Sequence, residues 1–559
     1  MTSRLLLPLL TATVAVAQIV VQNSPNQMQP TTGTSSLEGT VVNDATSEPV
    51  RKAQVSLLGM PGKAPVAVTD ASGSFAFRKL PAGTYGVTAM HEGFDQNRGA
   101  LLGENQKQVT VAADQNKSGV ELRLSPTGAI SGRLTDEVGD PAPNCNVGAI
   151  VANSFGGDSR QQLGLAQTDD RGEYRISNLP AGRYNVYQHC PQTLAAPHGF
   201  MERGDPRTPV WAWVPGFHGG AAIGAGADTM VVHGGEEVRG VDFRLKTTSA
   251  FSVPVALAPD GPGLDLRNVS VRLVPQDPAL ALVAQYGVGR MSNGGTFRSS
   301  GVVPGSYVAI ADLQQGEKRW HGEAPVEVGN TPPEPVELPL TAGMTLSGDV
   351  EVENGSAPGA DSARPTGTVS LTPLDPSRGF GYLQAQTDAD GSFTMAGVIA
   401  GRYQLQVMGP VNSIQSVTFG GHEVSPRAID IGADASGALH VVISVRQVRL
   451  QVSVAGLQPD RATWVFLLPK GISDPGPGLN PPMTMAQQGA VTITVTPGEY
   501  VAYAVECAQP WPLVNSAAAL HAIAGLGKAV ELKEGANASV TVDVIGREDL
   551  KRALDRELE

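Results

Sequence analysis

The stretch Thr69-Asp70-Ala71-Ser72-Gly73-Ser74-Phe75, followed by Leu80-Pro81-Ala82-Gly83-Thr84-Tyr85, decides the fold of this chain because it recurs. A second copy reads Thr168-Asp169-Asp170-Arg171-Gly172-Glu173-Tyr174 and continues with Leu179-Pro180-Ala181-Gly182-Arg183-Tyr184. Tandem self-similarity of this kind is typical of an array of small domains, each built on the same plan.

The number of repeats follows from the tyrosine at the end of the motif. A further clear copy runs from Thr387-Asp388-Ala389-Asp390-Gly391-Ser392-Phe393 to Ile399-Ala400-Gly401-Arg402-Tyr403, and degenerate copies end at Tyr307 and Tyr500. The five tyrosines stand at positions 85, 184, 307, 403 and 500, so the intervals are 99, 123, 96 and 97 residues. One unit therefore recurs five times, with one insertion in the second interval.

Each unit alternates apolar and polar residues with the period of a strand. Phe75 and Phe77 share one face, as do Tyr85, Val87 and Ala89. Further alternating runs at 37–41, 53–57, 109–111 and 120–124 bring the first unit to about seven short strands. That number predicts a two-sheet β-sandwich, and the whole chain is predicted to be all-β with a short C-terminal helix.

The motif residues are interpreted as turn chemistry. The aspartates are expected to accept backbone N–H groups two or three residues on, and the glycines to supply positive φ or close backbone approach. The hydroxyl of each tyrosine is expected to form a hydrogen bond with the backbone a few residues upstream, as in the tyrosine corner of other sandwiches. The predicted structural set is Asp70, Gly73, Gly83, Tyr85, Asp169, Gly172, Gly182, Tyr184, Asp388, Gly391, Gly401 and Tyr403.

On these turns the chain resembles the carboxypeptidase regulatory-like, or prealbumin-like, repeat family, which also includes the B-type repeats of bacterial collagen adhesins. An opening strand such as Ile130-Ser131-Gly132-Arg133-Leu134 adds to the likeness. The resemblance implies a prealbumin-like or Ig-like sandwich, grouped with carbohydrate-binding-like folds, and implies no chemistry. The Lys–Asn crosslinks of some adhesin repeats are disfavoured, because no lysine lies between Arg319 and Pro469.

The repeat spacing predicts eight segments. These are a signal peptide at 1–17, a disordered linker at 18–35, repeat 1 at 36–125, repeat 2 with its insertion at 126–246, a degenerate repeat 3 at 247–341, repeat 4 at 342–446, a degenerate repeat 5 at 447–546 and an amphipathic helix at 547–559. The repeats are expected to form an extended rod with a radius of gyration of about 36 Å or more, because repeat units contact mainly their neighbours.

The first residues are interpreted as an export signal. Arg4 precedes the apolar stretch 5–16, and Ala15-Val16-Ala17 offers the small residues of a cleavage site. A periplasmic, outer-surface or extracellular location is expected, with no transmembrane segment in the mature chain. The 40 basic and 53 acidic side chains give a net charge of −13, which disfavours nucleic acid as a partner.

Candidate chemistry is sparse. His233 and Glu236 have the HxxE spacing of a zinc site, but their alignment with a turn of the first repeat favours a hairpin, so no metal, cofactor or catalytic residue is predicted. Cys145 and Cys190 lie on the predicted inward faces of strands. There they either form a disulfide or remain two buried free thiols. Trp211 and Trp213 either stack on a ligand or cover the end of their own sandwich.

Two classes of function remain. The first is a secreted or cell-envelope structural and interaction protein that is not an enzyme, with an unknown envelope protein or polysaccharide as its partner. The second is a carbohydrate-binding protein that acts through the aromatic residues of repeat 2. A metallocarboxypeptidase-like enzyme is a distant third, because the chain contains no other recognisable catalytic motif.

Overall fold

The computed structural model describes residues 33–556 except for short internal segments. The segments left out are 61–63, 97–100, 103, 153–161, 191–207, 221–226, 262, 278–279, 283–285, 288–295, 317, 353–366, 375–381, 409–412, 434, 436, 445–447, 459–460, 472–480, 487–488 and 534–537. The predicted signal peptide and most of the predicted linker lie outside the described residues.

The first sandwich consists of two sheets with the strand orders β4-β1-β7 and β3-β2-β5-β6. Between them lies a core that includes Leu37, Phe75 and Tyr85, the residues of the alternating pattern. The strands are β1 (Ser35–Asn43), β2 (Gln54–Leu58), β3 (Val66–Val68), β4 (Ser74–Leu80), β5 (Gly83–Met90), β6 (Gln106–Val111) and β7 (Asn116–Leu124).

The second sandwich repeats this plan with the orders β11-β8-β16 and β10-β9-β12-β14. Its core includes Ile130, Tyr174 and Tyr184. The strands are β8 (Gly128–Thr135), β9 (Asn146–Val151), β10 (Gln162–Gln167), β11 (Glu173–Leu179), β12 (Gly182–His189), β14 (Gly216–Phe217), β15 (Thr229–Val232), β16 (Glu237–Val238) and β17 (Phe243–Arg244).

The third sandwich has its two sheets joined at one edge into the order β13-β18-β24-β23-β22-β19-β20, with β21 paired to β18. Its core includes Phe251, Phe297 and Tyr307. The elements are β13 (Val210–Trp213), β18 (Thr247–Pro259), η1 (Leu266–Asn268), β19 (Ser270–Pro275), η2 (Leu280–Leu282), β20 (Tyr286–Gly287), β21 (Thr296–Val302), β22 (Gly305–Gln315), β23 (Lys318–Val328) and β24 (Val336–Ala342).

The fourth sandwich returns to two separate sheets, β28-β25-β33-β30-β31 and β27-β26-β29-β32. Phe393, Tyr403 and Leu405 lie in its core. The strands are β25 (Met344–Val352), β26 (Thr368–Pro373), β27 (Leu383–Gln386), β28 (Ser392–Val398), β29 (Gly401–Met408), β30 (Ser413–Phe419), β31 (His422–Glu423), β32 (Ile429–Ile431) and β33 (Leu439–Ser444).

The fifth sandwich again joins its sheets, in the order β36-β35-β38-β40-β34-β37, and adds helices. The helices are α2 (Trp511–Val514), α3 (Ala517–Ile523), η4 (Ala524–Leu526) and α4 (Arg547–Arg556), the last of which confirms the predicted C-terminal helix. The strands are β34 (Val448–Ala455), β35 (Thr463–Pro469), β36 (Met483–Ala486), β37 (Ala490–Val495), β38 (Gly498–Glu506), β39 (Lys528–Leu532) and β40 (Ala538–Ile545).

One pairing rule unites the five sandwiches. In each, the opening strand pairs in parallel with a closing strand and antiparallel with the strand that follows the turn motif. The parallel pairs are β1 with β7, β8 with β16 and β17, β18 with β24, β25 with β33, and β34 with β40. The antiparallel pairs are β1 with β4, β8 with β11, β18 with β21, β25 with β28, and β34 with β37. The all-β fold of repeated sandwiches is confirmed, including the two copies whose motif is degenerate.

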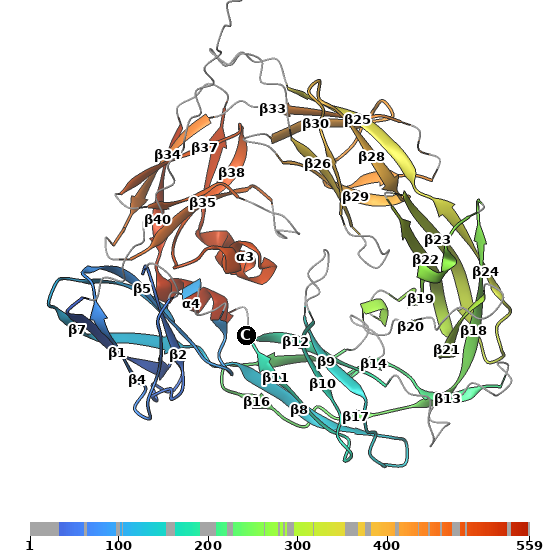
Figure 1. The fold of residues 1–559 in the computed structure, drawn as a ribbon, viewed down its shortest axis with the longest axis horizontal. Helices are drawn as coiled ribbons and strands as arrows, with labels where there is room; N and C mark the ends of the chain where they lie inside the picture. The colour runs from blue at the N-terminus through green and yellow to red at the C-terminus, as the bar shows by residue number, and fades with distance from the viewer. Residues whose placement is uncertain are drawn as a thin grey trace, which may run out of the picture.

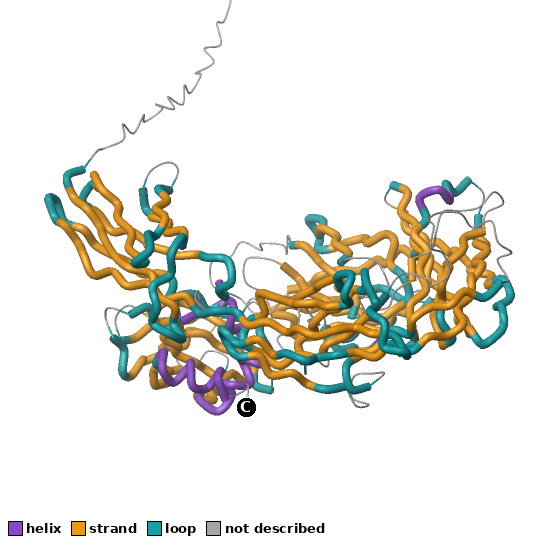
Figure 2. Tube along the Cα trace, turned by 90° about the horizontal axis from the view of Figure 1, so that it is seen from below, coloured by secondary structure: helices purple, strands orange, loops and turns teal. Residues whose placement is uncertain are grey.

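The predicted rod is wrong. Figure 1 shows the five sandwiches following one another around a closed circuit, with the first beside the fifth. Figure 2, at right angles, shows most of the circuit as a flat layer from which one sandwich stands out. The prediction counted contacts between neighbouring repeats only, whereas Leu101 and Leu102 of the first sandwich share a core with residues of the fifth.

Candidate functional site

The aspartate of the motif holds a tight turn together. In the second sandwich Asp169 Oδ1 accepts the backbone N–H groups of Arg171 and Glu173 at 2.9 and 2.8 Å. The bond from Glu173, and after it that from Arg171, outweighs partial desolvation and lowers the pKa of Asp169. Gly172 in the same turn has φ 73°, which only glycine adopts without cost. Asp70 and Gly73 repeat this geometry in the first sandwich.

A threonine that precedes the aspartate was not singled out from the sequence. Thr168 is buried, its hydroxyl donates to Ala142 O at 2.7 Å, and its Oγ1 accepts Cys145 N–H at 2.9 Å. Thr69 makes the same pair of bonds to Val50 O and Ala53 N. The recurrence of Thr before Asp was the available signal, and it indicates that this side chain ties the turn to the neighbouring strand.

The tyrosine corner recurs in four sandwiches. The hydroxyl of each tyrosine donates to the carbonyl oxygen four residues upstream. The bonds are Tyr85 to Pro81 at 2.6 Å, Tyr184 to Pro180 at 2.7 Å, Tyr307 to Val303 at 2.8 Å and Tyr403 to Ile399 at 2.8 Å. In the fifth sandwich Tyr500 instead meets the hydroxyl of Thr496 at 3.0 Å. Burial raises the pKa of Tyr184 well above its ordinary value, so this hydroxyl remains a donor.

Gly83, Gly182 and Gly401 were predicted to need either positive φ or close backbone approach, and in the structure their φ is not positive. The left-handed residue lies instead six positions before the tyrosine, at Lys79 (φ 59°), Asn178 (φ 60°), Gly301 (φ 73°) and Gly397 (φ 73°). The register of strand pairing shifts at this point in all four sandwiches, so a β-bulge bends the strand shortly before the glycine is reached. At Gly182 an added Cβ would lie 3.0 Å from Tyr184 Oη. A larger residue at this position would therefore crowd the tyrosine.

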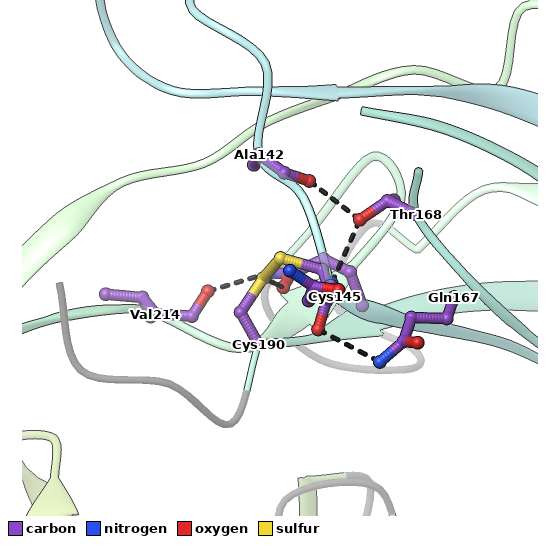
Figure 3. The surroundings of a disulfide bond; sticks show 8 residues. Ala142, Cys145, Gln167, Thr168, Cys190 and Val214 are labelled. Atoms are coloured by element: carbon purple, nitrogen blue, oxygen red, sulfur yellow. Dashed lines mark hydrogen bonds between the residues drawn. A yellow bond between two sulfur atoms is a disulfide. The ribbon is translucent and has the colours of Figure 1, made fainter. Parts of the chain in front are cut away.

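Cys145 and Cys190 form a disulfide in the core of the second sandwich. Their Cα atoms are 4.2 Å apart, and the two residues are 45 positions apart in the chain. The cysteines flank the antiparallel pair β9 and β12, just beyond the matched residues Asn146 and His189. Figure 3 shows Thr168 hydrogen-bonded to Ala142 and Cys145, which lie in the segment just before β9. The third cysteine, Cys507, is a buried free thiol.

The two tryptophans of the second-repeat insertion have different surroundings. Strand β13, which carries both, pairs with β18 and so belongs to the sheet of the third sandwich. Trp211 is 56% exposed. Trp213 packs against the core of the second sandwich. The insertion therefore bridges two sandwiches, and of this pair Trp211 is the exposed indole whereas Trp213 is partly buried.

His233 and Glu236 lie in the turn between β15 and β16, which belong to different sheets, so a turn is present but the predicted hairpin is not. The carboxylate of Glu236 accepts the backbone N–H of His233 at 3.2 Å, and Glu236 N–H donates to His233 O at 3.1 Å. Across the described parts of the chain, no three His, Cys, Asp or Glu side chains are grouped so that they could hold a metal ion. None of the helices described in residues 33–556 is long and apolar enough to cross a membrane.

A buried charge cluster in the third sandwich was missed by sequence reasoning. Asp312 lies between Arg272 (Nη1–Oδ2 2.7 Å) and His321 (Nδ1–Oδ1 2.7 Å), and His321 Nε2 lies 3.1 Å from Glu323 Oε1. Strands β19, β22 and β23 bring these residues together across the sheet, a pairing with no local sequence signal. Burial opposes protonation of His321, but the hydrogen bonds to Asp312 and Glu323 outweigh it and raise its pKa.

The charge cluster borders a cavity of about 300 Å³ between the third and fourth sandwiches. His321, Glu323 and Thr341 lie on one side, and Val398 and Ala433 on the other. Both ring nitrogens of His321 face carboxylates, and the Thr341 hydroxyl donates to His321 O at 3.2 Å. These groups stabilise one another, an arrangement that suits a structural role rather than proton transfer.

Comparison with known proteins supports the resemblance in the first sandwich. Residues 36–125 match the family described as the carboxypeptidase regulatory-like domain. No curated protein matches the chain.

Several solved structures match parts of the chain at low similarity. They include the Bacillus anthracis TIE protein (14% identity, 55% of this chain and 50% of that chain, TM-score 0.17), the minor pilin GBS52 of Streptococcus agalactiae (13%, 41% and 100%, TM-score 0.19) and the shaft pilin spaA of Lactobacillus rhamnosus GG (10%, 38% and 98%, TM-score 0.21). The match to the Bacillus anthracis protein spans half of that protein's length. The chain is a multi-domain β-repeat protein, and these likenesses assign it no activity.

Proposed function

We propose that this protein is an exported structural and interaction protein of the cell envelope or its exterior, and not an enzyme. The observation that carries the proposal is that the repeated polar residues form hydrogen bonds with the protein's own backbone. Asp169, Thr168 and Tyr184 each direct their polar atoms to backbone groups of their own turn or of the adjacent strand. The most repeated side chains of the molecule therefore build a scaffold, and surface regions between the turns are left for recognition.

The segment boundaries belong to the same proposal. Repeats at 36–125, 126–246, 247–341, 342–446 and 447–546 would act as folding units, with 1–17 removed on export. The disulfide between Cys145 and Cys190 supports passage through an oxidising compartment, because such bonds persist mainly there.

Cell fractionation with N-terminal sequencing, followed by sedimentation with isolated envelope fragments, tests this function. We expect a mature chain that begins at Gln18 and binds the fragments saturably. A cytoplasmic chain with its first 17 residues intact would contradict export. Stoichiometric zinc together with peptidase activity, both lost in His233→Ala, would replace the scaffold by the metallocarboxypeptidase-like alternative.

A carbohydrate-binding role is the second candidate, and the exposure of Trp211 favours it. An exposed indole on an edge strand offers a flat apolar face to a sugar ring. On a polysaccharide array, binding that falls in Trp211→Ala but persists in Trp511→Ala is expected, since Trp511 is 45% exposed elsewhere on the chain. Equal binding by both variants excludes Trp211 as the sugar contact.

A further inference from the structure

Two leucines of the first sandwich are buried outside the core of that sandwich. Leu101 and Leu102 lie between strands β5 and β6, and Leu102 is fully buried. Their apolar neighbours belong to the fifth sandwich and include Phe466, Leu513 and Leu520. The backbone N–H of Ala508 also donates to Leu101 O at 3.1 Å. These leucines are therefore used to join the two ends of the described chain.

The surface that receives them is made largely of helices added to the sandwich plan. Helices α2 and α3 stand between strands β38 and β39, and α4 follows β40. Their apolar residues Leu513, Leu520 and Leu550 are fully or almost fully buried in the shared cluster. Without the first sandwich, part of this apolar surface would face water, at a cost of about 25 cal/mol for each Å² exposed.

An ion pair lies beside the apolar contact. Lys551 Nζ of α4 is 2.9 Å from Asp44 Oδ2, and Arg123 Nη1 of the first sandwich is 3.9 Å from the same carboxylate. The side chain of Asp44 is largely buried. Loss of one partner from such a partly buried pair costs more than loss of an exposed pair, because the remaining charge is left desolvated.

We propose that the helices of the fifth sandwich are a docking surface for the first sandwich of the same chain, and that this clasp closes the molecule into a ring. The clasp consists of Leu101, Leu102 and Asp44 on one side and of Lys551 with the apolar faces of α2, α3 and α4 on the other. Tethering favours closure within one chain, because the second, third and fourth sandwiches hold the two surfaces in one molecule and make their contact intramolecular. The docking does not depend on the partner that the ring recognises.

Zero-length carbodiimide crosslinking of the dilute full chain tests the clasp, because it joins a carboxylate directly to an amine. We expect an Asp44–Lys551 crosslink in the monomer band, identified by peptide mass mapping. In Leu102→Asp this crosslink should fall by about tenfold or more, the equivalent of about 1.4 kcal/mol. The matched control is Leu165→Asp, which places the same charge at an exposed leucine of β10 and should leave the crosslink unchanged.

Three results would overturn the proposal: no crosslink in the monomer, a crosslink confined to covalent dimers, or an undiminished crosslink in Leu102→Asp. The dimer result would mean that the surface receives a second copy of the chain. Hydrogen exchange at strands β1 to β7 checks that Leu102→Asp is folded. If it is not, Asp44→Lys is compared with wild type, and α4 should then exchange faster; unchanged exchange of α4 would equally reject the clasp.

Discussion

The tyrosine corner shows at the scale of one residue how the repeat is stabilised. Tyr184 is buried with its hydroxyl 2.7 Å from Pro180 O. Tyr184→Phe keeps the ring but leaves that carbonyl without this donor, so we expect a loss of about 1–2 kcal/mol in the unfolding free energy of the second sandwich. Chemical denaturation followed by hydrogen exchange at β12 measures it.

The control for this prediction is Tyr382→Phe, which removes a hydroxyl from a tyrosine that is 62% exposed. It should leave stability within error of the wild type. Equal stability of the two variants would show that the tyrosine corner contributes packing and not a hydrogen bond.

Single residues were predictable from the sequence where their role is local. Asp169 and Tyr184 bond to backbone within four positions of themselves, which is the kind of local partner that the sequence predicted, although the aspartate bonds two and four positions on rather than two or three. The φ of Gly182 was not predictable in the same way, because the left-handed residue lies at the bulge at Asn178, four positions earlier. Lys79 takes the same left-handed conformation in the first repeat, which no propensity for lysine indicates.

At the scale of elements, the disulfide fixes two neighbouring strands of one sheet. Replacing both Cys145 and Cys190 by Ala removes a link across 45 positions of the chain. We expect a loss of about 2–4 kcal/mol, because the unfolded second sandwich becomes free to expand. Differential scanning calorimetry measures the shift, and Cys507→Ala serves as the control for a buried thiol without a bond. An unchanged transition in the double variant would contradict this role.

The charge cluster makes the sheet of β19, β22 and β23 sensitive to pH. The folded pKa of His321 lies above 6.5, because hydrogen bonds to Asp312 and Glu323 outweigh burial. A raised pKa means that the stabilisation is complete below pH 6.5 and is lost as pH rises through the folded value. Arg272 faces the carboxylate of Asp312 from the other side.

We therefore expect the third sandwich to unfold at lower denaturant concentration at pH 8.5 than at pH 6, with hydrogen exchange at β22 and β23 as the readout. His321→Gln should flatten this pH profile, whereas His422→Gln, an exposed histidine on β31, should leave it unchanged. A profile that keeps its slope in His321→Gln would assign the pH dependence to another group.

Elements were predictable to the extent that their pattern is periodic. Alternation located the strands that carry Phe75 and Tyr85, and the amphipathic pattern of residues 547–559 located α4. Strand β13 was placed in the second repeat because it precedes Thr247 in the chain, yet it pairs with β18 of the next sandwich. Helices α2 and α3 were missed because they are only four and seven residues long, too short for a period that separates them from a buried strand.

At the scale of the whole molecule, the order of the repeats was predictable and their closure was not. Closure depends on a contact between Asp44 and Lys551, which are 507 positions apart. No repeat period encodes such a contact, because each copy of the motif describes only its own sandwich. The signal that the sequence did contain was the pair Leu101-Leu102 between two predicted strands of the first unit, apolar residues that the sandwich pattern left unexplained.

The radius of gyration separates the ring from the rod. Five units of about 25 Å each form a circuit of about 125 Å, whose radius is about 20 Å. Each unit has its own radius of gyration of about 13 Å, and the two contributions combine to about 24 Å for the closed molecule. An open row of the same units reaches about 36 Å or more. Small-angle scattering of the monomer should therefore give a value much nearer 24 than 36 Å. Leu102→Asp should move the value toward the larger one, and a wild-type value near 36 Å would mean that the ends of the chain do not meet in solution.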